Sequence, residues 1–315
     1  GIVTSITAEL EDYVEIYFPE AHKDASLMSE LASAVYDVFG LESLKVPFCM
    51  TVEAEALGST VDFGDKYVFP QVKEKQQIGR EFIEKNRNID LKNIKRVPIV
   101  LEAIRRLKKK YKDEVAITSV VVGPMSILGM LFGFNQLFYT MIDDPKLFKE
   151  LILFVTDVGI SYAKLQVEAG TDMIQIGEAG ASGDLIGPDT YRDMVLPYHQ
   201  RLCKGINVPV VMHICGNIEK NLPYIRNLDI AAISIDERTR IDVVKKELEE
   251  KVKIIGYVPC QELLGSTPEK IKISTRKCIA KGVDVLNSGC AISPYTPTVN
   301  IQAMVNAAEN YFNQR

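Results

Sequence analysis

The chain has 315 residues, of which 47% are hydrophobic and 25% are charged, and its formal net charge is −5. This length and composition are typical of one large globular domain, since α/β barrels often reach this size as a single unit. The net negative charge argues against a general nucleic-acid binder. Six cysteines at irregular spacing, with no signal peptide before them, indicate free thiols in a reducing cytoplasm rather than a disulfide framework.

Predicted helices and strands alternate along the chain. Apolar side chains recur at helical spacing over residues 25–39, 145–168 and 268–281. Segments rich in apolar and β-branched residues predict seven strands, at 45–51, 116–122, 172–177, 208–214, 231–236, 253–258 and 284–288. This alternation predicts an α/β fold, a single-domain (β/α)8 TIM-type barrel over residues 1–315 with one strand unplaced. We expect a helical segment of about residues 1–43 to pack on the barrel. An open doubly wound sheet is the alternative, but no G-x-G-x-x-G motif follows a strand.

Residues 115–142 contain no charged side chain, and this length exceeds the roughly 20 residues that a transmembrane helix needs. Gly123-Pro124 interrupts the segment, however. The residues before this pair are β-branched, and those after it are rich in Leu, Met and Gly. A strand, a turn and a buried helix therefore explain the apolar segment without a membrane.

Residues 105–112 carry six positive charges in eight positions. Cations near the C-terminus of a helix are stabilised by the helix dipole, so the run predicts an exposed helix end. A docking patch for an acidic protein is the alternative.

A histidine and two cysteines follow or end two of the predicted strands. His213 and Cys215 lie at the end of the 208–214 strand, and Cys290 follows the 284–288 strand. Because the carboxyl ends of barrel strands meet on one face, we expect the three side chains to lie together. An imidazole and two thiolates suit Zn²⁺, and three protein ligands leave a fourth tetrahedral position open for a reactant. A buried histidine with two core thiols is the alternative.

Carboxylates and hydroxyls follow other predicted strands. Glu178 comes directly after the 172–177 strand, and we expect it to be catalytic by orienting His213, accepting a thiol proton or occupying the open metal position. Candidate substrate contacts after two strands are Glu53, Ser182 and Asp184, each of which can equally cap a helix. Of the other cysteines, Cys49 is expected in the core, and no partner set is evident for Cys203, Cys260 and Cys278.

Several motifs together resemble the uroporphyrinogen decarboxylase superfamily, and within it the methylcobamide:coenzyme M methyltransferases. They include the segment 208–217, Val-Pro-Val-Val-Met-His-Ile-Cys-Gly-Asn, the segment 183–188 and the pair Gly289-Cys290. The resemblance runs from about Tyr17 to the C-terminus. It implies an α/β barrel with zinc on His213, Cys215 and Cys290, and with Asn217 among the substrate contacts. The implied activity is methyl transfer from a methylated corrinoid to a thiol such as coenzyme M.

The decarboxylases themselves are a less favoured interpretation. They share an arginine-rich motif, R-Q-A-G-R, whose cations meet the carboxylates of a porphyrin, and this chain has no such motif. Residues 45–51 contain no arginine. Since a substrate with many carboxylates needs fixed cations, their absence argues against porphyrin decarboxylation.

The corrinoid is expected to arrive on a separate protein that carries methyl-Co(III). Corrinoid carriers resemble one another in a D-x-H-x-x-G motif, whereas this chain has Val211 at the aspartate position. Other acceptors or donors stay open, namely tetrahydrofolate as a pterin acceptor, or a methoxy or methylamine compound as the donor to the corrinoid. A non-catalytic, zinc-stabilised scaffold is a further alternative. No nucleic-acid or membrane partner is expected.

Overall fold

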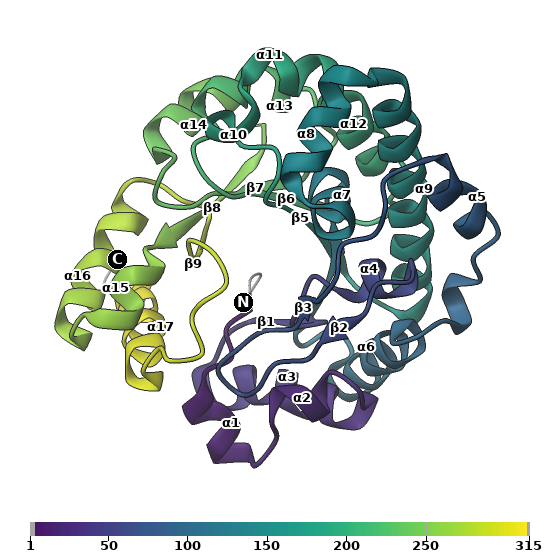
Figure 1. The fold of residues 1–315 in the computed structure, drawn as a ribbon. Coiled ribbons are helices and arrows are strands. Elements are labelled where there is room, and N and C mark those ends of the chain that lie inside the picture. The colour runs from purple at the N-terminus through teal and green to yellow at the C-terminus, as the bar shows by residue number, and fades with distance from the viewer. Residues whose placement is uncertain (1–3, 250, 314–315) are drawn as a thin grey trace.

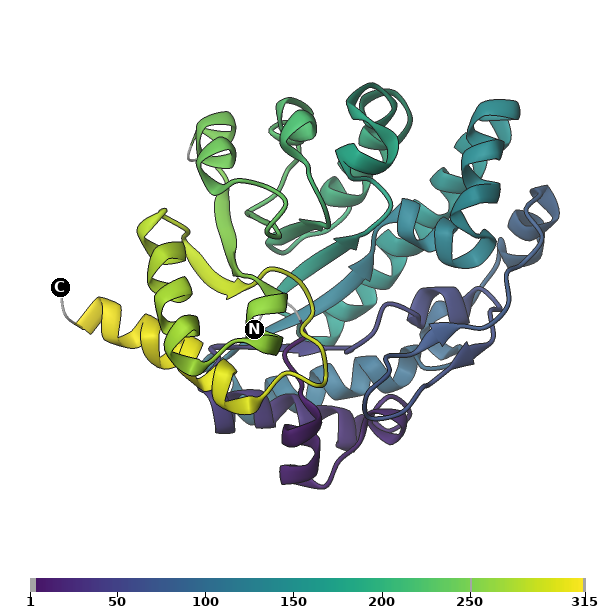
Figure 2. The same cartoon turned by 60° about the vertical axis from the view of Figure 1, so that its left-hand side comes forward.

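The computed structural model describes residues 4–249 and 251–313. Seven parallel strands form one sheet in the order β1-β4-β5-β6-β7-β8-β9, and the sheet curls into a barrel with helices on its outer side (Figures 1 and 2). The strands are β1 (Ser43–Val46), β4 (Ala116–Val122), β5 (Met173–Glu178), β6 (Val210–Ile214), β7 (Ala232–Ser234), β8 (Lys253–Val258) and β9 (Val285–Ser288). The predicted TIM-type α/β fold and all seven predicted strands are confirmed.

The predicted eighth strand does not appear in the described part of the sheet, whose edge strands are β1 and β9. An extended segment before the first helix joins the loops that follow these edges. Thr4 Oγ1 donates to the carbonyl of Phe48 (3.2 Å), and the Thr4 carbonyl accepts from Ile292 N (3.2 Å). The strand predicted at 45–51 is too long at its C-terminal end. β1 ends at Val46, because Pro47 has no N–H to continue the hydrogen bonds between strands.

Helices connect the strands and cover the outside of the barrel (Figure 1). The three predicted helical patterns correspond to α3 (Ala25–Phe39), α9 (Pro145–Ala169) and α16 (Pro268–Ala280). The other α-helices are α1 (Ala8–Val14), α2 (Phe18–Ala21), α4 (Val52–Ala56), α5 (Arg80–Asn86), α6 (Val97–Tyr111), α7 (Pro124–Phe132), α8 (Phe134–Asp143), α10 (Gly183–Ile186), α11 (Pro188–Thr190), α12 (Leu196–Lys204), α13 (Leu222–Ile225), α14 (Ile241–Leu248), α15 (Cys260–Gly265) and α17 (Thr298–Asn313). A two-stranded hairpin, β2 (Val61–Asp62) and β3 (Gln71–Val72), follows α4.

The N-terminal helices share one hydrophobic core with the barrel. Asp24 caps α3 by accepting from Leu27 N (2.9 Å), and the left-handed Gly40 ends it. Phe18 of α2 and Met28 of α3 are fully buried in the same cluster as the outward-facing side chains of the sheet. The expected helical segment of about residues 1–43, packed on the barrel as a unit, stays a prediction.

The apolar segment 115–142 folds as predicted into β4, a turn and the buried helix α7, followed by α8. Among the described residues, no single helix is long and apolar enough to cross a membrane. The helices α7 and α8 reach that length and apolarity only as a pair, and they are bent by 109° relative to each other.

The basic run lies at the C-terminal end of α6, as predicted, and several of its cations have acidic partners. Lys108 pairs with Asp172 (2.7 Å) and Asp113 (3.2 Å), and Arg106 pairs with Glu102 (3.2 Å). Because α6 leads into the start of β4, the run lies at the amino end of the sheet. That end is opposite the carboxyl ends of the strands, so the run is not beside the predicted site.

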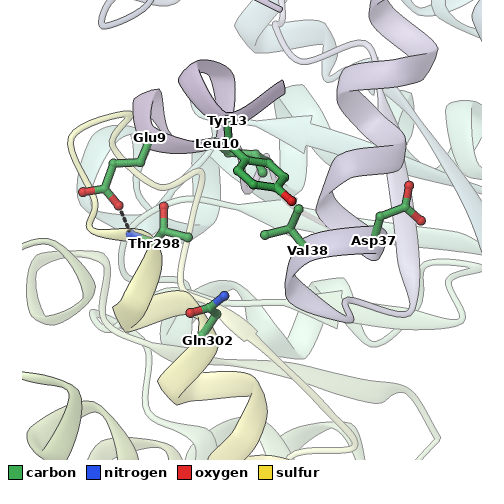
Figure 3. A pocket seen from close by; sticks show the side chains of 7 residues that line it. All are labelled: Glu9, Leu10, Tyr13, Asp37, Val38, Thr298 and Gln302. Atoms are coloured by element: carbon green, nitrogen blue, oxygen red, sulfur yellow. Dashed lines mark hydrogen bonds between the residues drawn. The ribbon is translucent and has the colours of Figure 1, made fainter. Parts of the chain in front are cut away.

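A surface hollow lies between α1, α3 and α17, outside the barrel (Figure 3). Tyr13, Val38 and Gln302 line it, and Glu9 Oε2 at its edge accepts from Thr298 N (2.8 Å). None of the predicted site residues lines this hollow.

Candidate metal centre

The three predicted metal ligands converge at the carboxyl ends of β6 and β9. Cys215 Sγ lies 3.3 Å from His213 Nε2 and 3.8 Å from Cys290 Sγ. The three donor atoms all lie within 4.8 Å of one another. His213 is buried, whereas both cysteines are partly exposed. The cluster therefore combines a buried imidazole with two partly exposed cysteines.

These separations fit a tetrahedral zinc site. With Zn–S bonds of about 2.3 Å and Zn–N bonds of about 2.0–2.1 Å, tetrahedral angles place two sulfurs about 3.8 Å apart and a sulfur and a nitrogen about 3.5 Å apart. The two separations that involve Cys215, 3.8 Å to Cys290 Sγ and 3.3 Å to His213 Nε2, agree with these values. The donor set and its geometry thus suit zinc, with one coordination position left for a reactant.

Ser234 fixes the orientation of the His213 ring. His213 pairs in register with Ser234 on the neighbouring strand β7, and His213 Nδ1 shares a hydrogen bond of 3.1 Å with Ser234 Oγ. Because Ser234 is fully buried, this contact leaves Nε2 as the nitrogen that faces Cys215. Metal-bound histidines generally depend on such a partner for the second nitrogen. The sequence did not indicate Ser234, because it meets His213 only through the register between β6 and β7.

We predict that Ser234→Ala lowers the affinity for zinc by roughly 10- to 100-fold, the range typical of the loss of a hydrogen-bond partner to a ligating histidine. Competition with a chromophoric chelator measures the affinity. Ser161→Ala is the matched control, since Ser161 Oγ only donates to the Asp157 carbonyl on the exposed side of α9. Equal zinc affinities in the two variants would contradict the role of Ser234.

Cys260 and Ser288 hold the backbone of Cys290. Cys290 N donates to Cys260 Sγ (3.3 Å), and the Cys290 carbonyl accepts from Cys260 Sγ (3.3 Å) and from Ser288 Oγ (2.9 Å). Cys260 had no partner in the sequence analysis, since it follows β8 and meets Cys290 only in the folded chain.

Three of the predicted substrate contacts lie beside the loop that follows Cys215. Asp184 Oδ2 accepts from Asn217 N (3.2 Å), and Gly183 N donates to the Asn217 carbonyl (2.9 Å). Gly216 has a left-handed φ of 87°, and a Cβ there would lie 3.1 Å from Ser182 Cβ. Ser182, Asp184 and Asn217 therefore form one group next to the sulfur pair, while their contact with substrate stays a prediction.

Glu178 is fully buried and uses its carboxylate to join three segments. Its oxygens accept from Met125 N (3.1 Å), Ser126 Oγ (2.5 Å) and Gly180 N (2.9 Å), and one of them lies 3.2 Å from His199 Nε2. These contacts place the carboxylate at the N-terminus of α7, where the helix dipole favours a negative charge.

The backbone of Glu178 also contacts the metal centre directly. Its carbonyl accepts from Cys215 N (3.2 Å), whereas the nitrogen that orients His213 is held by Ser234 and not by Glu178. The expected catalytic role of Glu178 stays a prediction, and its observed contacts fix the segment that carries Cys215.

Glu53 lies in α4, and its carboxylate reaches the end of β4. It is buried, its Oε1 accepts from Val122 N (2.8 Å), and burial raises its pKa to about 7. The contact between Glu53 and substrate stays a prediction. Nearby, the expected core residue Cys49 is buried beside Arg96. Burial opposes ionisation of this thiol, but the charges of His22 and Arg96 lower its pKa to about 5.

The two sulfurs of the candidate metal centre lie within hydrogen-bonding distance of each other, 3.8 Å apart. A hydrogen bond between them raises the pKa of Cys215 and lowers that of Cys290, which the contact with His213 also lowers. A divalent metal would displace the thiol protons, as thiolate ligation requires.

The fold and the cluster define an α/β barrel with a candidate metal centre of one histidine and two cysteines at the carboxyl ends of its strands. Residues 2–311 match the family model described as uroporphyrinogen decarboxylase (URO-D), and the chain belongs to this family.

Within the family, the chain is similar to methyltransferases. Methylcobamide:CoM methyltransferase MtbA from Methanosarcina acetivorans is 35% identical over 308 residues, covering 97% of this chain and 90% of that protein. A methylated-thiol–coenzyme M methyltransferase from Methanosarcina mazei is 33% identical, covering 96% and 82%. Among solved structures, a methyltransferase from Methanosarcina mazei has a TM-score of 0.90 at 29% identity, covering 99% of this chain and 93% of its own. The resemblance inferred from the motifs is confirmed.

Proposed function

We propose that the protein is a zinc-dependent methyltransferase that moves a methyl group from a methylated corrinoid to a thiol such as coenzyme M. The observation that carries this proposal is the convergence of His213 Nε2, Cys215 Sγ and Cys290 Sγ at the carboxyl ends of the strands. The similarity to methylcobamide:CoM methyltransferases over nearly the whole chain supports it.

Zinc held by these three residues would lower the pKa of a thiol substrate and keep its sulfur as a nucleophile. In the transfer, the sulfur forms a bond to the methyl carbon as the carbon–cobalt bond breaks. The electron pair of that bond stays on cobalt, which passes from Co(III) to Co(I), and the thiol proton leaves to solvent. The products are a thioether and a reduced corrinoid.

The protein's own residues would keep the reacting sulfur in place. Ser234 orients His213, and Cys260 with Ser288 fixes Cys290. Glu178 is proposed to support transfer through its contacts with α7 and with Cys215 N. Substrate contacts are proposed for Glu53, Ser182, Asp184 and Asn217.

The corrinoid is proposed to arrive on a separate protein. Val211, at the position where a corrinoid carrier has its aspartate, packs inside the barrel with Ala232 and Ile255. An apolar side chain there offers no hydrogen bond to a histidine that ligates cobalt.

The loop after Cys290 contacts the β2–β3 hairpin through the stacked rings of Tyr67 and Tyr295, whose centroids lie 4.5 Å apart. The protein is also proposed to be cytoplasmic. All six of its cysteines are free thiols, which are typical of a reducing compartment.

Turnover of free methylcobalamin tests this proposal. We expect the zinc-loaded protein to consume the colour of methylcobalamin with coenzyme M, and to use homocysteine or tetrahydrofolate poorly. Formation of the methyl thioether, followed by mass spectrometry, identifies the acceptor. Transfer to tetrahydrofolate alone would favour the pterin alternative, and no transfer to any acceptor would favour a non-catalytic scaffold.

A further inference from the structure

A chain of hydrogen bonds joins three fully buried side chains at the end of β5. Glu178 Oε2 lies 3.2 Å from His199 Nε2, and His199 Nδ1 lies 3.1 Å from the Tyr191 hydroxyl. His199 belongs to α12, and Tyr191 lies in the turn before that helix. Neither His199 nor Tyr191 has a role in the proposed function.

The chemistry of the three groups fixes the direction of these hydrogen bonds. A carboxylate can only accept, so His199 Nε2 carries a hydrogen and donates it to Glu178. In a neutral imidazole the other nitrogen is then an acceptor, and the Tyr191 hydroxyl donates to it. Tyr191 therefore favours the tautomer of His199 that binds Glu178.

A π-helical turn brings Tyr191 and His199 together. The turn spans Tyr191–Val195 and leads directly into α12. In a regular α-helix of 3.6 residues per turn, side chains eight positions apart point about 80° away from each other. The wider π turn reduces this angle, and the two rings lie with their centroids 5.6 Å apart. Such turns are rare and frequent at functional sites, which indicates a role for this pair.

The main chain of Glu178 connects this chain of hydrogen bonds to the metal centre. Glu178 is paired in register with Ile214, and its carbonyl accepts from the N–H of Cys215 (3.2 Å). The position of the Glu178 main chain therefore sets the position of the residue that carries one of the two sulfurs.

The carboxylate of Glu178 is tightly enclosed. A Cβ at Gly123 would lie 2.7 Å from Glu178 Cδ, so only a glycine leaves room for the carboxylate there. Without His199, Oε2 would keep Met125 N as its one remaining donor among the described residues. A buried acceptor that loses a donor is costly, so we expect the end of β5 to shift when this contact is removed.

We propose that His199 is a positioning residue for the metal ligand Cys215. Its ring holds the Glu178 carboxylate, and the Glu178 carbonyl in turn holds Cys215 N. Cys215 Sγ thereby stays at 3.3 Å from His213 Nε2 and 3.8 Å from Cys290 Sγ. This inference rests on the proposed function, because it takes Cys215 to bind zinc.

Two amide substitutions separate the two hydrogen bonds of His199. In His199→Gln the amide lies near the position of Nε2 and can donate to Glu178, whereas in His199→Asn it lies near Nδ1 and reaches only Tyr191. We expect His199→Asn to lower the zinc affinity by about 10-fold, the lower end of the range for residues that support a metal ligand. His199→Gln should keep most of the wild-type affinity. Competition with a chromophoric chelator measures both values.

The cobalt(II)-substituted protein gives a second readout. Absorption from sulfur to cobalt depends on the geometry of the two thiolates, and a loss of stability alone would not change it. We expect this absorption to shift in His199→Asn and to keep its wild-type form in His199→Gln.

Tyr191→Phe should act in the same direction more weakly, because it releases the tautomer but keeps the donor to Glu178. We expect a loss of zinc affinity of roughly 2- to 10-fold, as the loss of one neutral hydrogen bond costs. The matched controls are Tyr162→Phe and His22→Asn, which alter a fully buried tyrosine and a fully buried histidine outside this chain of hydrogen bonds. Both controls should lose stability without a change in zinc affinity or in the cobalt absorption.

Wild-type zinc affinity and cobalt absorption in His199→Asn, or equal changes in His22→Asn, would overturn the inference. If His199→Asn does not fold by circular dichroism, Tyr191→Phe against Tyr162→Phe gives the same comparison, and equal zinc affinities in that pair would overturn it. The expected losses of zinc affinity, together with no methyl transfer by the zinc-loaded wild type, would instead contradict the proposed function alone.

Discussion

Cys290→Ala is expected to lower the zinc content from about one ion per chain to a small fraction of that and to slow methyl transfer by more than about 100-fold. Loss of an outer hydrogen-bond partner typically costs 10- to 100-fold, and loss of one of three protein ligands should cost more. Removing this sulfur leaves only His213 and Cys215, which are adjacent to each other on β6 and its loop. Metal analysis of the purified variant and methylcobalamin turnover measure the two effects.

Cys203→Ala is the matched control for this prediction. Cys203 is a buried thiol of α12, and burial raises its pKa to about 12, as expected for a core residue without a metal-binding role. The control should lose some stability but keep its zinc and its activity. If Cys290→Ala kept both as well, the third ligand would be wrongly assigned and the centre would need another donor.

The strands could be predicted from the sequence because their boundaries coincide with local signals. The bounds of Ala116–Val122 and Lys253–Val258 match the predicted segments, since Gly123 and Pro259 directly follow the β-branched runs. The strand at 45–51 was predicted too long, because hydrophobicity continues past Pro47 whereas the hydrogen-bond ladder does not. An eighth strand was inferred from the fold type and not from any segment of the chain.

The metal ligands could also be predicted, since both strand ends carry residues that favour a soft divalent metal. The residues that hold these ligands in place could not be predicted. Ser234 meets His213 only through the register between β6 and β7, and Cys260 meets Cys290 only because β8 and β9 are neighbours. Periodicity indicates which residues are in strands, but it does not give the register across the sheet.

Glu178 illustrates a second limit of prediction from the sequence alone. Its position after the predicted 172–177 strand indicated a polar group near the strand ends, but the sequence did not show that α7 would begin beside it. The N–H of Met125 and the hydroxyl of Ser126 bind the carboxylate before a substrate could. A buried acceptor with several donors is therefore first a structural contact, and any effect on catalysis acts through the segment that it holds.

Removal of zinc by a chelator is expected to abolish methyl transfer while the barrel stays folded. The hydrophobic core extends from the N-terminal helices through the strands to α17 and does not include His213, Cys215 or Cys290. A core of this size does not need a metal for its stability. Circular dichroism of the chelated protein tests the fold, and readdition of zinc should restore turnover.

Binding of a thiol to the zinc-loaded protein should release about one proton per site near pH 7. A free thiol with a pKa of about 8.5 is mostly protonated at this pH, and its coordination to zinc requires the thiolate. Calorimetry in buffers of different ionisation enthalpy measures the proton release. The metal-free protein should release none with the same thiol. A folded, metal-free protein that consumed methylcobalamin at the normal rate would exclude zinc from the mechanism, and His213, Cys215 and Cys290 would then need another role.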